Sequence, residues 1–349
     1  MPDVRRISIK DLAREAGVSY STVSRALDPN PQVNQLISSE VRLRIQELAQ
    51  ARGYSPNALA QSLQARRTNS IGLVITSVSD PFFVDVVAGV EEMARASGIS
   101  VFLAMSNNDP EQEIKVIETF NRRRVDGIIV AASRVGTEYT NRLEQIRIPV
   151  VLINNQAVGE YQNLYSVSID DAYGARMAVT HLLALGHRRI GYIGVSNRPR
   201  SNERRFQSYY QTLSSAGIEI EPGWIAISEA MISEDFNGDI QVGRHKLPDL
   251  INARVTAIFC YCDTVAAGAL IACRHMGITV PDQMSIVGFD DSILCQVLSP
   301  PLTTICQPKR QLGQIAMDML LTLKAGGVVS NSVIQPTLIV RGSTAPPPP

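Results

Sequence analysis

The sequence predicts a small all-helical head followed by an α/β body with two parallel sheets. Residues 8–53 contain three short amphipathic helical patterns separated by turn residues. From residue 70 onward, apolar runs of strand length alternate with amphipathic helical runs, which is typical of parallel sheets covered by helices. The number and length of these runs, in a chain of 349 residues, indicate two sheets.

The first two helices of the predicted head form a helix-turn-helix pattern. Ser8 can cap the first helix, whose apolar residues repeat at i, i+3, i+4 and i+7, and Gly17 permits the tight turn that follows. Ser19 can cap the second helix, which begins at Tyr20. A short helix, a glycine turn and a second helix make a helix-turn-helix unit.

The second helix, in the stretch VSYSTVSRAL (18–27), separates apolar from polar side chains. Val23, Ala26 and Leu27 share one arc, and tyrosine, hydroxyl residues and arginine occupy the other. Small hydroxyl groups let a helix approach base edges, and an arginine can bind guanine. A solvated face on an ordinary three-helix packing domain is the alternative interpretation. The candidate DNA contacts of the head are Ser8, Ser19, Tyr20, Ser21, Thr22, Ser24 and Arg25.

A third helix is expected from about Ser39, and Gly53 can end it. Residues 1–68 carry ten basic and six acidic side chains, whereas the rest of the chain carries 23 basic and 27 acidic ones. A basic head on an acidic body suits a polyanionic partner.

The stretch SPNALAQSLQARR (55–67) is the predicted linker. Ser55 can cap a helix and Pro56 suits the first helical position. However, about eight residues do not hold a helix alone in water. From these residues alone, a flexible tether between head and body is the favoured interpretation.

The body should bind a ligand at the carboxyl ends of its strands. The runs expected as strands are 70–76, 99–105, 126–132, 149–154, 165–169, 189–195, 256–261 and 285–289. Carboxylates, amides and arginines suit a polyhydroxylated ligand, and aromatic rings suit its C–H face. The two phenylalanines could instead belong to the core, and Asp290 could cap a turn. The candidate contacts are Asp80, Phe82, Phe83, Arg134, Asn154, Arg205, Phe236, Cys262, Asp263 and Asp290.

Other classes of protein lack support in the sequence. It has no GxGxxG, P-loop or GxSxG motif, and its four histidines form no catalytic pattern, so we expect no enzyme, cofactor or metal site. The five cysteines are expected to be buried and reduced. No signal-peptide or transmembrane pattern is visible, which favours a cytoplasmic protein over a transport solute-binding protein.

Longer motifs extend through the chain. They are IKDLAREAGVSYSTVSRAL, ARGYSPNALAQSL, RRTNSIGLVI, DPFF, VDGIIV, LGHRRIGYIG, VGFDD, PPLTTI and LIVRGST. In this order and spacing they resemble the LacI/GalR family of bacterial transcriptional repressors over nearly the whole chain. The resemblance implies a homodimeric regulator, without membrane attachment, that binds a pseudo-palindromic double-stranded DNA operator and responds to a sugar or sugar derivative. The alternative is a cytoplasmic small-molecule-binding protein without a gene-regulatory role.

The resemblance also implies a division into domains. The head would span 1–54, the hinge helix and linker 55–69, the effector-binding and dimerisation domain 70–342, and a Pro-rich tail 343–349. The body would consist of two doubly wound parallel-sheet subdomains that resemble periplasmic sugar-binding proteins, with subdomain one at about 70–167 and 301–328 and subdomain two at about 168–300 and 329–342.

Within these domains the resemblance implies particular residues. Leu63 would enter the minor groove of DNA as a wedge, with Asn57 and Ala60 on the same face of a hinge helix. Two features depart from the family. The segment 28–42 is about four residues longer than usual, which loops tolerate. Cys262 replaces the usual Asn, and a thiol is a poor substitute for an amide, so we expect one common sugar contact to be missing.

Overall fold

The computed structural model divides the chain into two units, Met1–Thr68 and Asn69–Pro349, which we call the head and the body. None of the described helices has both the length and the apolar character needed to cross a bilayer. The structure describes residues 7–28, 31–54, 68–132, 142, 146–155, 163–196, 199–228 and 236–349.

The head is a helical unit around one small core. Its helices are α1 (Ile9–Ala16), α2 (Tyr20–Ala26), α3 (Pro31–Asn34) and α4 (Ser39–Ala51). Ser8 and Ser19 cap α1 and α2 as predicted, and Gly17 between them has a φ of +65°. Leu12, Val23 and Ile45 are fully buried and hold the three longer helices together. The extended loop before α4 contains the short α3, and α4 begins at Ser39 as expected.

The first lobe of the body is a parallel sheet of six strands in the order β11-β5-β4-β3-β1-β2. Its side chains alternate between two cores: Leu73 faces α6 and α14, whereas Val74 faces α7. The strands are β1 (Ser70–Ile75), β2 (Ser100–Met105), β3 (Ile128–Ala131), β4 (Val150–Ile153), β5 (Leu164–Ile169) and β11 (Ser332–Ile334); the helices are α6 (Phe82–Ala96), α7 (Pro110–Arg122) and α14 (Lys309–Lys324).

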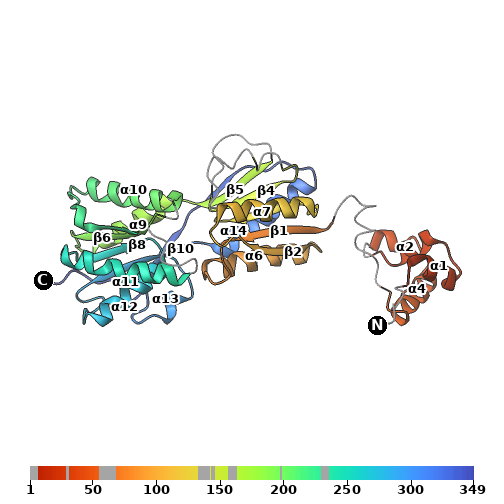
Figure 1. Ribbon diagram of the computed structural model, residues 1–349, viewed down its shortest axis with the longest axis horizontal. Helices are drawn as coiled ribbons and strands as arrows, with labels where there is room; N and C mark the ends of the chain where they lie inside the picture. Colours follow the sequence, from red (N-terminus) through yellow and green to blue (C-terminus); the bar gives the residue numbers. More distant parts are fainter. Residues whose placement is uncertain are drawn as a thin grey trace. The chain divides into compact units, whose positions relative to one another are not determined.

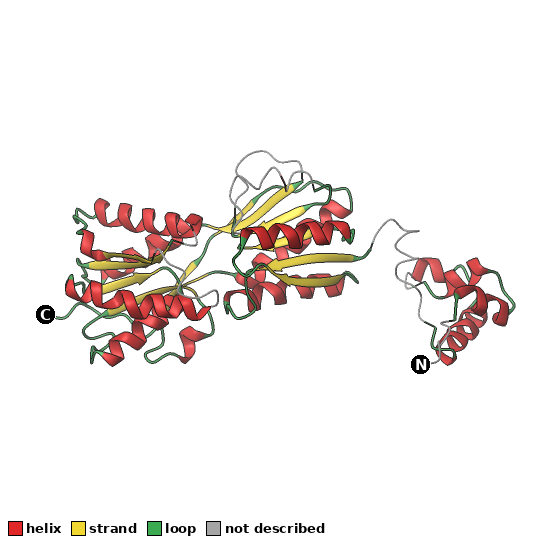
Figure 2. Ribbon diagram, viewed as in Figure 1, coloured by secondary structure: helices red, strands yellow, loops and turns green. Residues whose placement is uncertain are grey.

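The second lobe repeats this plan in the order β12-β10-β9-β8-β6-β7, and β12 alone is antiparallel to its neighbour. Helices cover the sheets of both lobes (Figures 1 and 2). The strands are β6 (Ile190–Val195), β7 (Ile225–Ser228), β8 (Ala257–Cys260), β9 (Ser285–Asp290), β10 (Thr303–Cys306) and β12 (Thr337–Ile339); the helices are α9 (Asp171–Ala184), α10 (Pro199–Ser215), α11 (Phe236–Asn252), α12 (Asp263–His275) and α13 (Leu294–Val297).

The chain passes between the lobes after β5, after β10 and after β11, so late residues occur in both lobes (Figure 1). Two expected limits of the subdomains need correction. β10 pairs with β9 of the second lobe, so the expected limit at 300/301 moves to about residue 307. β11 pairs with β5 of the first lobe, so the limit at 328/329 moves to the segment between β11 and β12. β10 and β11 each form hydrogen bonds with a neighbouring strand of their lobe. The pattern of apolar residues did not reveal these two strands.

The expected Pro-rich tail at 343–349 begins inside the second lobe. Ser343 is fully buried, and its carbonyl oxygen accepts a hydrogen bond from the Ile286 amide at 2.8 Å. His187 Nε2 lies 2.8 Å from the Ala345 carbonyl oxygen, and Ser285 donates its hydroxyl to the same oxygen. Residues 343–345 therefore belong to the lobe, because buried polar groups of β9 and its surroundings need them as partners.

Four of the five cysteines are buried, as predicted, and Cys306 is half-buried. All five are free thiols.

Each lobe contains a pair of helices in direct backbone contact. A Cβ at Gly313 of α14 would overlap the carbonyl oxygen of Val86 in α6, and a Cβ at Gly89 of α6 would overlap the carbonyl oxygen of Arg310. Gly243 of α11 and Gly268 of α12 make the equivalent contacts in the second lobe. Since the obstructing atoms belong to the backbone, the two helices of each pair are expected to move together.

Gly313→Ala is expected to lower the free energy of unfolding of the body by about 1–3 kcal/mol, because overpacking outweighs the better helix propensity of alanine. Urea unfolding measures this effect. Asp318→Ala, at an exposed position of the same helix, is the matched control. Equal stability of Gly313→Ala and the parent protein would show that α6 and α14 can separate freely.

Candidate functional site

Helix α2 presents the side chains that the sequence pattern assigned to DNA. Val23 and Ala26 are buried in the head core, whereas Tyr20 is 46% exposed and Ser21 and Arg25 are also exposed. The helix therefore has an apolar face directed inward and a polar face that a partner can reach.

Hydroxyl groups gather at the start of this helix. Ser19 Oγ lies 2.8 Å from both Ser21 Oγ and Thr22 Oγ1, and it accepts a hydrogen bond from the Thr22 amide. Ser24 is half-buried on the same helix. Ser8 donates its hydroxyl to an aspartate of its own capping box in α1. Ser8 and Ser19 therefore fix the helix starts, and Ser21 and Thr22 extend the polar face.

The predicted hinge residues Asn57, Ala60 and Leu63 lie outside the described residues, as does Arg134. Phe236 begins α11, but its side chain is not among those described.

Arg205, on α10, is buried in the second lobe at the boundary with the first. Its Nε donates to Asp171 Oδ1 at 2.8 Å, and its Nη1 donates to the Tyr261 carbonyl oxygen at 2.7 Å. Nη1 also lies 3.9 Å from Asp290 Oδ1. Within the described residues Nη2 makes no hydrogen bond, which leaves its N–H groups for a ligand.

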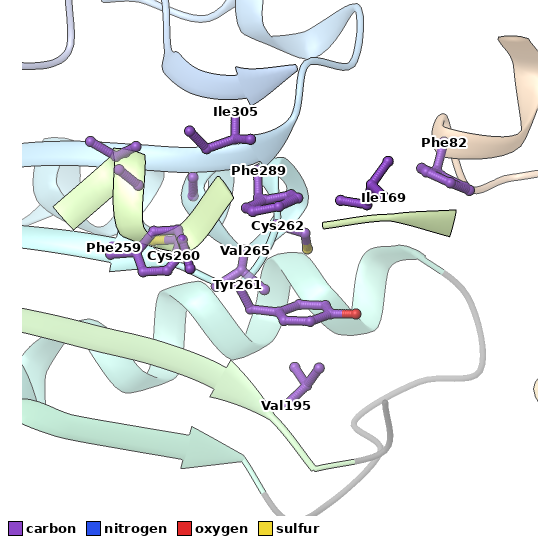
Figure 3. Close-up of a cluster of buried hydrophobic side chains, with 14 of the residues drawn as sticks. Phe82, Ile169, Val195, Phe259, Cys260, Tyr261, Cys262, Val265, Phe289 and Ile305 are labelled. Atoms are coloured by element: carbon purple, nitrogen blue, oxygen red, sulfur yellow. The ribbon is translucent and has the colours of Figure 1, made fainter. Parts of the chain in front are cut away.

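Aromatic rings hold the guanidinium of Arg205 in place. Its central carbon lies 3.6 Å from the centre of the Phe289 ring and 4.7 Å from that of Tyr261. The Tyr261 hydroxyl lies 2.7 Å from Ser201 Oγ. Figure 3 shows this hydroxyl pointing away from the cluster around Phe259. Stacking and hydrogen bonds together fix the arginine in one orientation.

Asp290 ends β9 and is held by the segment that leads into the first lobe. Gln307 Nε2 donates to Asp290 Oδ1 at 2.6 Å. The buried Lys309 donates its ammonium to the carbonyl oxygens of Asp290 and Asp291. These two aspartates have backbone φ angles of +119° and +53°, which residues other than glycine rarely adopt. Such strain persists only where the surroundings impose it, and it is common at binding sites.

The first lobe contributes Asp80 and two phenylalanines near the start of α6. Asp80 Oδ1 accepts the amide of Phe82 at 3.0 Å. The rings of Phe82 and Phe83 meet edge to face with their centres 5.1 Å apart. Phe83 is only 1% exposed and packs the core, in agreement with the alternative interpretation. Phe82 lies near Ile169 at the boundary between the lobes (Figure 3).

Asn154 and Asp263 use their side chains inside the protein. Asn154 Nδ2 donates to Gln307 Oε1 at 2.7 Å, and its Oδ1 accepts the Ile169 amide at 3.2 Å. Asp263 accepts the hydroxyl of Thr304 on one oxygen and an amide on the other, and it is 1% exposed. These contacts give both residues a role in joining strands and crossings; the ligand contact expected from their positions at strand ends stays a prediction.

Cys262, where the family usually has Asn, is almost fully buried. Its sulfur lies 2.9 Å from Thr264 Oγ1 and 3.9 Å from Asp239 Oδ2. The thiol therefore contacts polar groups of its own lobe at the edge of the apolar core.

The sequence pattern missed four residues of this region: Asp171, Tyr261, Gln307 and Lys309. The rule that polar residues follow strand ends could have found Asp171, which lies two positions after β5, and Tyr261, which directly follows β8. It could not find Gln307 and Lys309, because β10 before them was not predicted as a strand. We call Asp80, Arg205, Tyr261 and Asp290 the inter-lobe site.

The site concentrates carboxylates around one arginine. Burial raises the pKa of Asp290 to about 8; the cations Arg205 and Lys309 oppose this rise, and the carboxylates of Asp263 and Asp80 add to it. Asp80 comes from the first lobe, so the two lobes bring like charges together at this point. Because its pKa is about 8, Asp290 holds a proton at neutral pH, so its carboxyl group and Arg205 can both donate to a hydroxyl of a ligand.

Asp290→Asn is expected to gain stability relative to the parent protein as pH rises. Between about pH 4 and pH 8 the folded protein holds a proton on Asp290 that the unfolded chain releases, so this group lowers the free energy of unfolding as pH increases. Asparagine does not titrate and can still accept the bond from Gln307. Melting temperatures measured across this range test the prediction, with the exposed Asp318→Asn as control. A difference that does not change with pH would contradict the raised pKa.

Comparisons with known proteins agree with this architecture. Residues 8–57 match the bacterial regulatory proteins of the lacI family, and residues 179–344 match a periplasmic binding protein-like domain. The lac repressor dimer bound to operator and the anti-inducer ONPF has a TM-score of 0.83 at 26% identity, covering 98% of this chain and 100% of that one. A LacI family regulator of Enterococcus faecium with bound ribose has a TM-score of 0.68 at 26% identity, covering 79% of this chain and 99% of that one.

Relatives match over almost their full length. The ribose operon repressor of Haemophilus influenzae is 32% identical over 338 residues, which is 96% of this chain and 98% of the repressor. The transcriptional regulator GalS of Salmonella typhimurium is 34% identical over 344 residues, or 97% of each chain. The chain belongs to the lacI family of bacterial regulatory proteins.

Proposed function

We propose that this protein is a sequence-specific DNA-binding transcriptional repressor whose affinity for its operator is controlled by a small polyhydroxylated ligand. The observation that carries this proposal is the exposed polar face of α2, with Tyr20, Ser21 and Arg25 outward while the apolar side chains of the same helix are buried. A helix of this kind can enter the major groove and reach base edges. The relatives named above are repressors or regulators.

Arg25→Ala is expected to weaken operator binding by about 1–3 kcal/mol and to relax the preference at one base pair, because Arg25 would form a bidentate contact with guanine. The probe is an operator fragment that the protein itself selects from genomic DNA, and affinity is measured by fluorescence anisotropy at fixed salt. Arg14→Ala, at an exposed position of α1, is the matched control. An equal loss on operator and on random DNA would make Arg25 a phosphate contact only.

The linker would act together with this helix. We propose that Leu63 inserts into the minor groove, with Asn57 and Ala60 on the same face, once the segment folds on DNA. A segment that folds only on the operator is a suitable point of control. If the body moves the residue to which the linker is attached, the free energy needed to fold the linker on DNA changes.

The ligand would bind at the inter-lobe site. Arg205 Nη2 offers hydrogen-bond donors. The Asp290 carboxyl group, whose Oδ2 makes no hydrogen bond within the described residues, offers a donor while it holds its proton and an acceptor once it has lost it. Asp80 adds a carboxylate from the first lobe, and Tyr261 adds an aromatic face. This set of groups matches the alternating hydroxyl and C–H surfaces of a sugar. A ligand held by both lobes would draw them together, as in hinge closure.

Cys262 bears on which sugar is bound. In place of an amide, its thiol sits against Thr264 and Asp239. We propose that the ligand lacks the hydroxyl that this amide would recognise, or presents it elsewhere. A thermal-shift screen of free and phosphorylated sugars tests the ligand class, and assay of the hits for chemical turnover separates a binding protein from an enzyme.

We propose that the active species is a homodimer, because two heads can then read the two halves of a pseudo-palindromic operator. Phe102 and Leu103 on the edge strand β2 are 45% and 46% exposed, and Val84 on α6 is 64% exposed. Exposed apolar side chains on an edge strand favour burial against a partner. A DNA partner would place the dimer in the cytoplasm.

Leu103→Asp is expected to convert the dimer into monomers and to weaken operator binding at least about 100-fold, because a carboxylate would be buried in the interface and the two half-sites would no longer be bound together. Sedimentation velocity measures the oligomeric state. Val328→Asp alters a valine that is 94% exposed outside this surface and should remain dimeric. A dimeric Leu103→Asp variant would exclude this face as the interface.

A further inference from the structure

The C-terminal end of helix α14 lies beside the first residue of the body. Lys324 Nζ is 2.7 Å from Asp126 Oδ2 and donates to Asn69 Oδ1 at 3.0 Å. The Asn69 amide donates to Asp126 Oδ2 at 3.1 Å. The side chains of Lys324 and Asp126 are only 17% and 9% exposed, which shields their interaction from solvent. We call these three residues the linker anchor, because the linker precedes Asn69 in the sequence.

The anchor joins three separate parts of the first lobe. Asn69 leads into β1, and its φ of +47° sets the direction in which the chain enters the strand. Asp126 precedes β3, and its amide donates to the carbonyl oxygen of Ser70 at 2.7 Å. Lys324 is the last residue of α14. A displacement of α14 along its axis therefore acts directly on the residue where the linker ends.

The opposite end of α14 is in direct contact with the inter-lobe site. Lys309, its first residue, binds the carbonyl oxygens of Asp290 and Asp291, and Gln307 binds the Asp290 carboxylate. Gln307 also accepts a hydrogen bond from Asn154 of the first lobe. Any change in the position of Asp290 relative to the first lobe must therefore change these contacts.

Helix α14 connects the contacts around Asp290 with the linker anchor. It contains 16 residues and thus spans about 24 Å. Gly313 brings its backbone into contact with α6, and Arg310 pairs with Glu92 of α6 at 2.9 Å. The two helices are therefore expected to move together, and α14 has the inter-lobe site at one end and the anchor at the other.

We propose that Lys324, Asp126 and Asn69 are positioning residues for DNA binding, and that α14 transmits the state of the inter-lobe site to this anchor and so to the linker. The proposal rests on the proposed function, since it describes how ligand and operator would influence each other. Within one chain, α14 would carry the influence of the ligand to the linker, in addition to any effect of the dimer interface. By linkage, operator binding must act back along the same route to the inter-lobe site.

The variant Lys324→Met tests the anchor, because it keeps the length of the side chain and removes its charge. Lys324→Arg is the conservative variant, and Lys115→Met, at an exposed position of α7, is the matched control. The first measurement is limited trypsin digestion of the full-length, DNA-free protein, with cleavage after Arg66 and Arg67 followed by mass spectrometry. We expect cleavage in Lys324→Met to be several-fold faster than in the parent protein and in Lys115→Met, with Lys324→Arg close to the parent.

The second measurement is hydrogen exchange with and without an operator fragment that the protein selected from genomic DNA. In the parent protein, operator binding should change exchange in peptides covering 286–298 and 307–312. In Lys324→Met this change should be lost, while the melting temperature of the body stays within a few degrees of the parent value.

Each result decides a separate claim. Unchanged cleavage in Lys324→Met, or an operator effect at 286–298 that survives in this variant, would overturn the proposal. A parent protein that selects no DNA would overturn the proposed function, and the digestion would still show whether the anchor controls the linker. An unfolded Lys324→Met variant would be replaced by Asp126→Asn, which removes the charge from the other side of the same pair.

Discussion

The body depends on the hydrogen bonds that hold its three chain crossings side by side. Asn154 joins the end of β5 to Gln307, Gln307 joins the second crossing to Asp290, and the Asp170 amide binds the carbonyl oxygen of Ile334 at the third. Three tied crossings allow the lobes to rotate against each other but prevent them from separating. The contacts that tie the crossings also hold Asp290, so the state of the inter-lobe site and the angle between the lobes cannot change independently.

This coupling explains why the buried charges lie where they do. A buried arginine with carboxylates on two sides is costly to place in a protein core unless its geometry is well satisfied. Here Asp171 and two aromatic rings interact with the Arg205 guanidinium. Its Nη2 amino group makes no hydrogen bond within the described residues. Similarly, the Oδ2 oxygen of Asp290 makes no hydrogen bond within the described residues. The carboxylate of Asp80, from the first lobe, raises the pKa of Asp290. The raised pKa of Asp290 follows from this arrangement, because burial and the neighbouring carboxylates of Asp263 and Asp80 disfavour its charged form.

Much of this architecture follows from local patterns in the sequence. All eight long apolar runs are strands or enter strands, and the helix starts at Ser8 and Ser19 follow from capping chemistry. Strands β7, β10, β11 and β12 were not predicted, because their sequences (IAIS, TTIC, SVI and TLI) contain no run of more than three apolar residues. The rule of strand ends applies to Asp290, which ends β9, whereas Arg205 lies within α10; the role of both residues in ligand binding stays a prediction. The rule could not show that Asn154 and Asp263 are occupied by partners, since those contacts join residues far apart in the sequence.

We propose that the ligand and the operator act on a single conformational equilibrium of the protein. The most direct test measures two ratios by titration calorimetry and anisotropy under identical salt and temperature: the change in operator affinity caused by saturating sugar, and the change in sugar affinity caused by saturating operator. The sugar is the one that raises the melting temperature of the protein most. Equal ratios, of about 5- to 150-fold, are expected, because coupling free energies are reciprocal. A sugar that binds the free and the operator-bound protein with the same affinity would contradict this proposal.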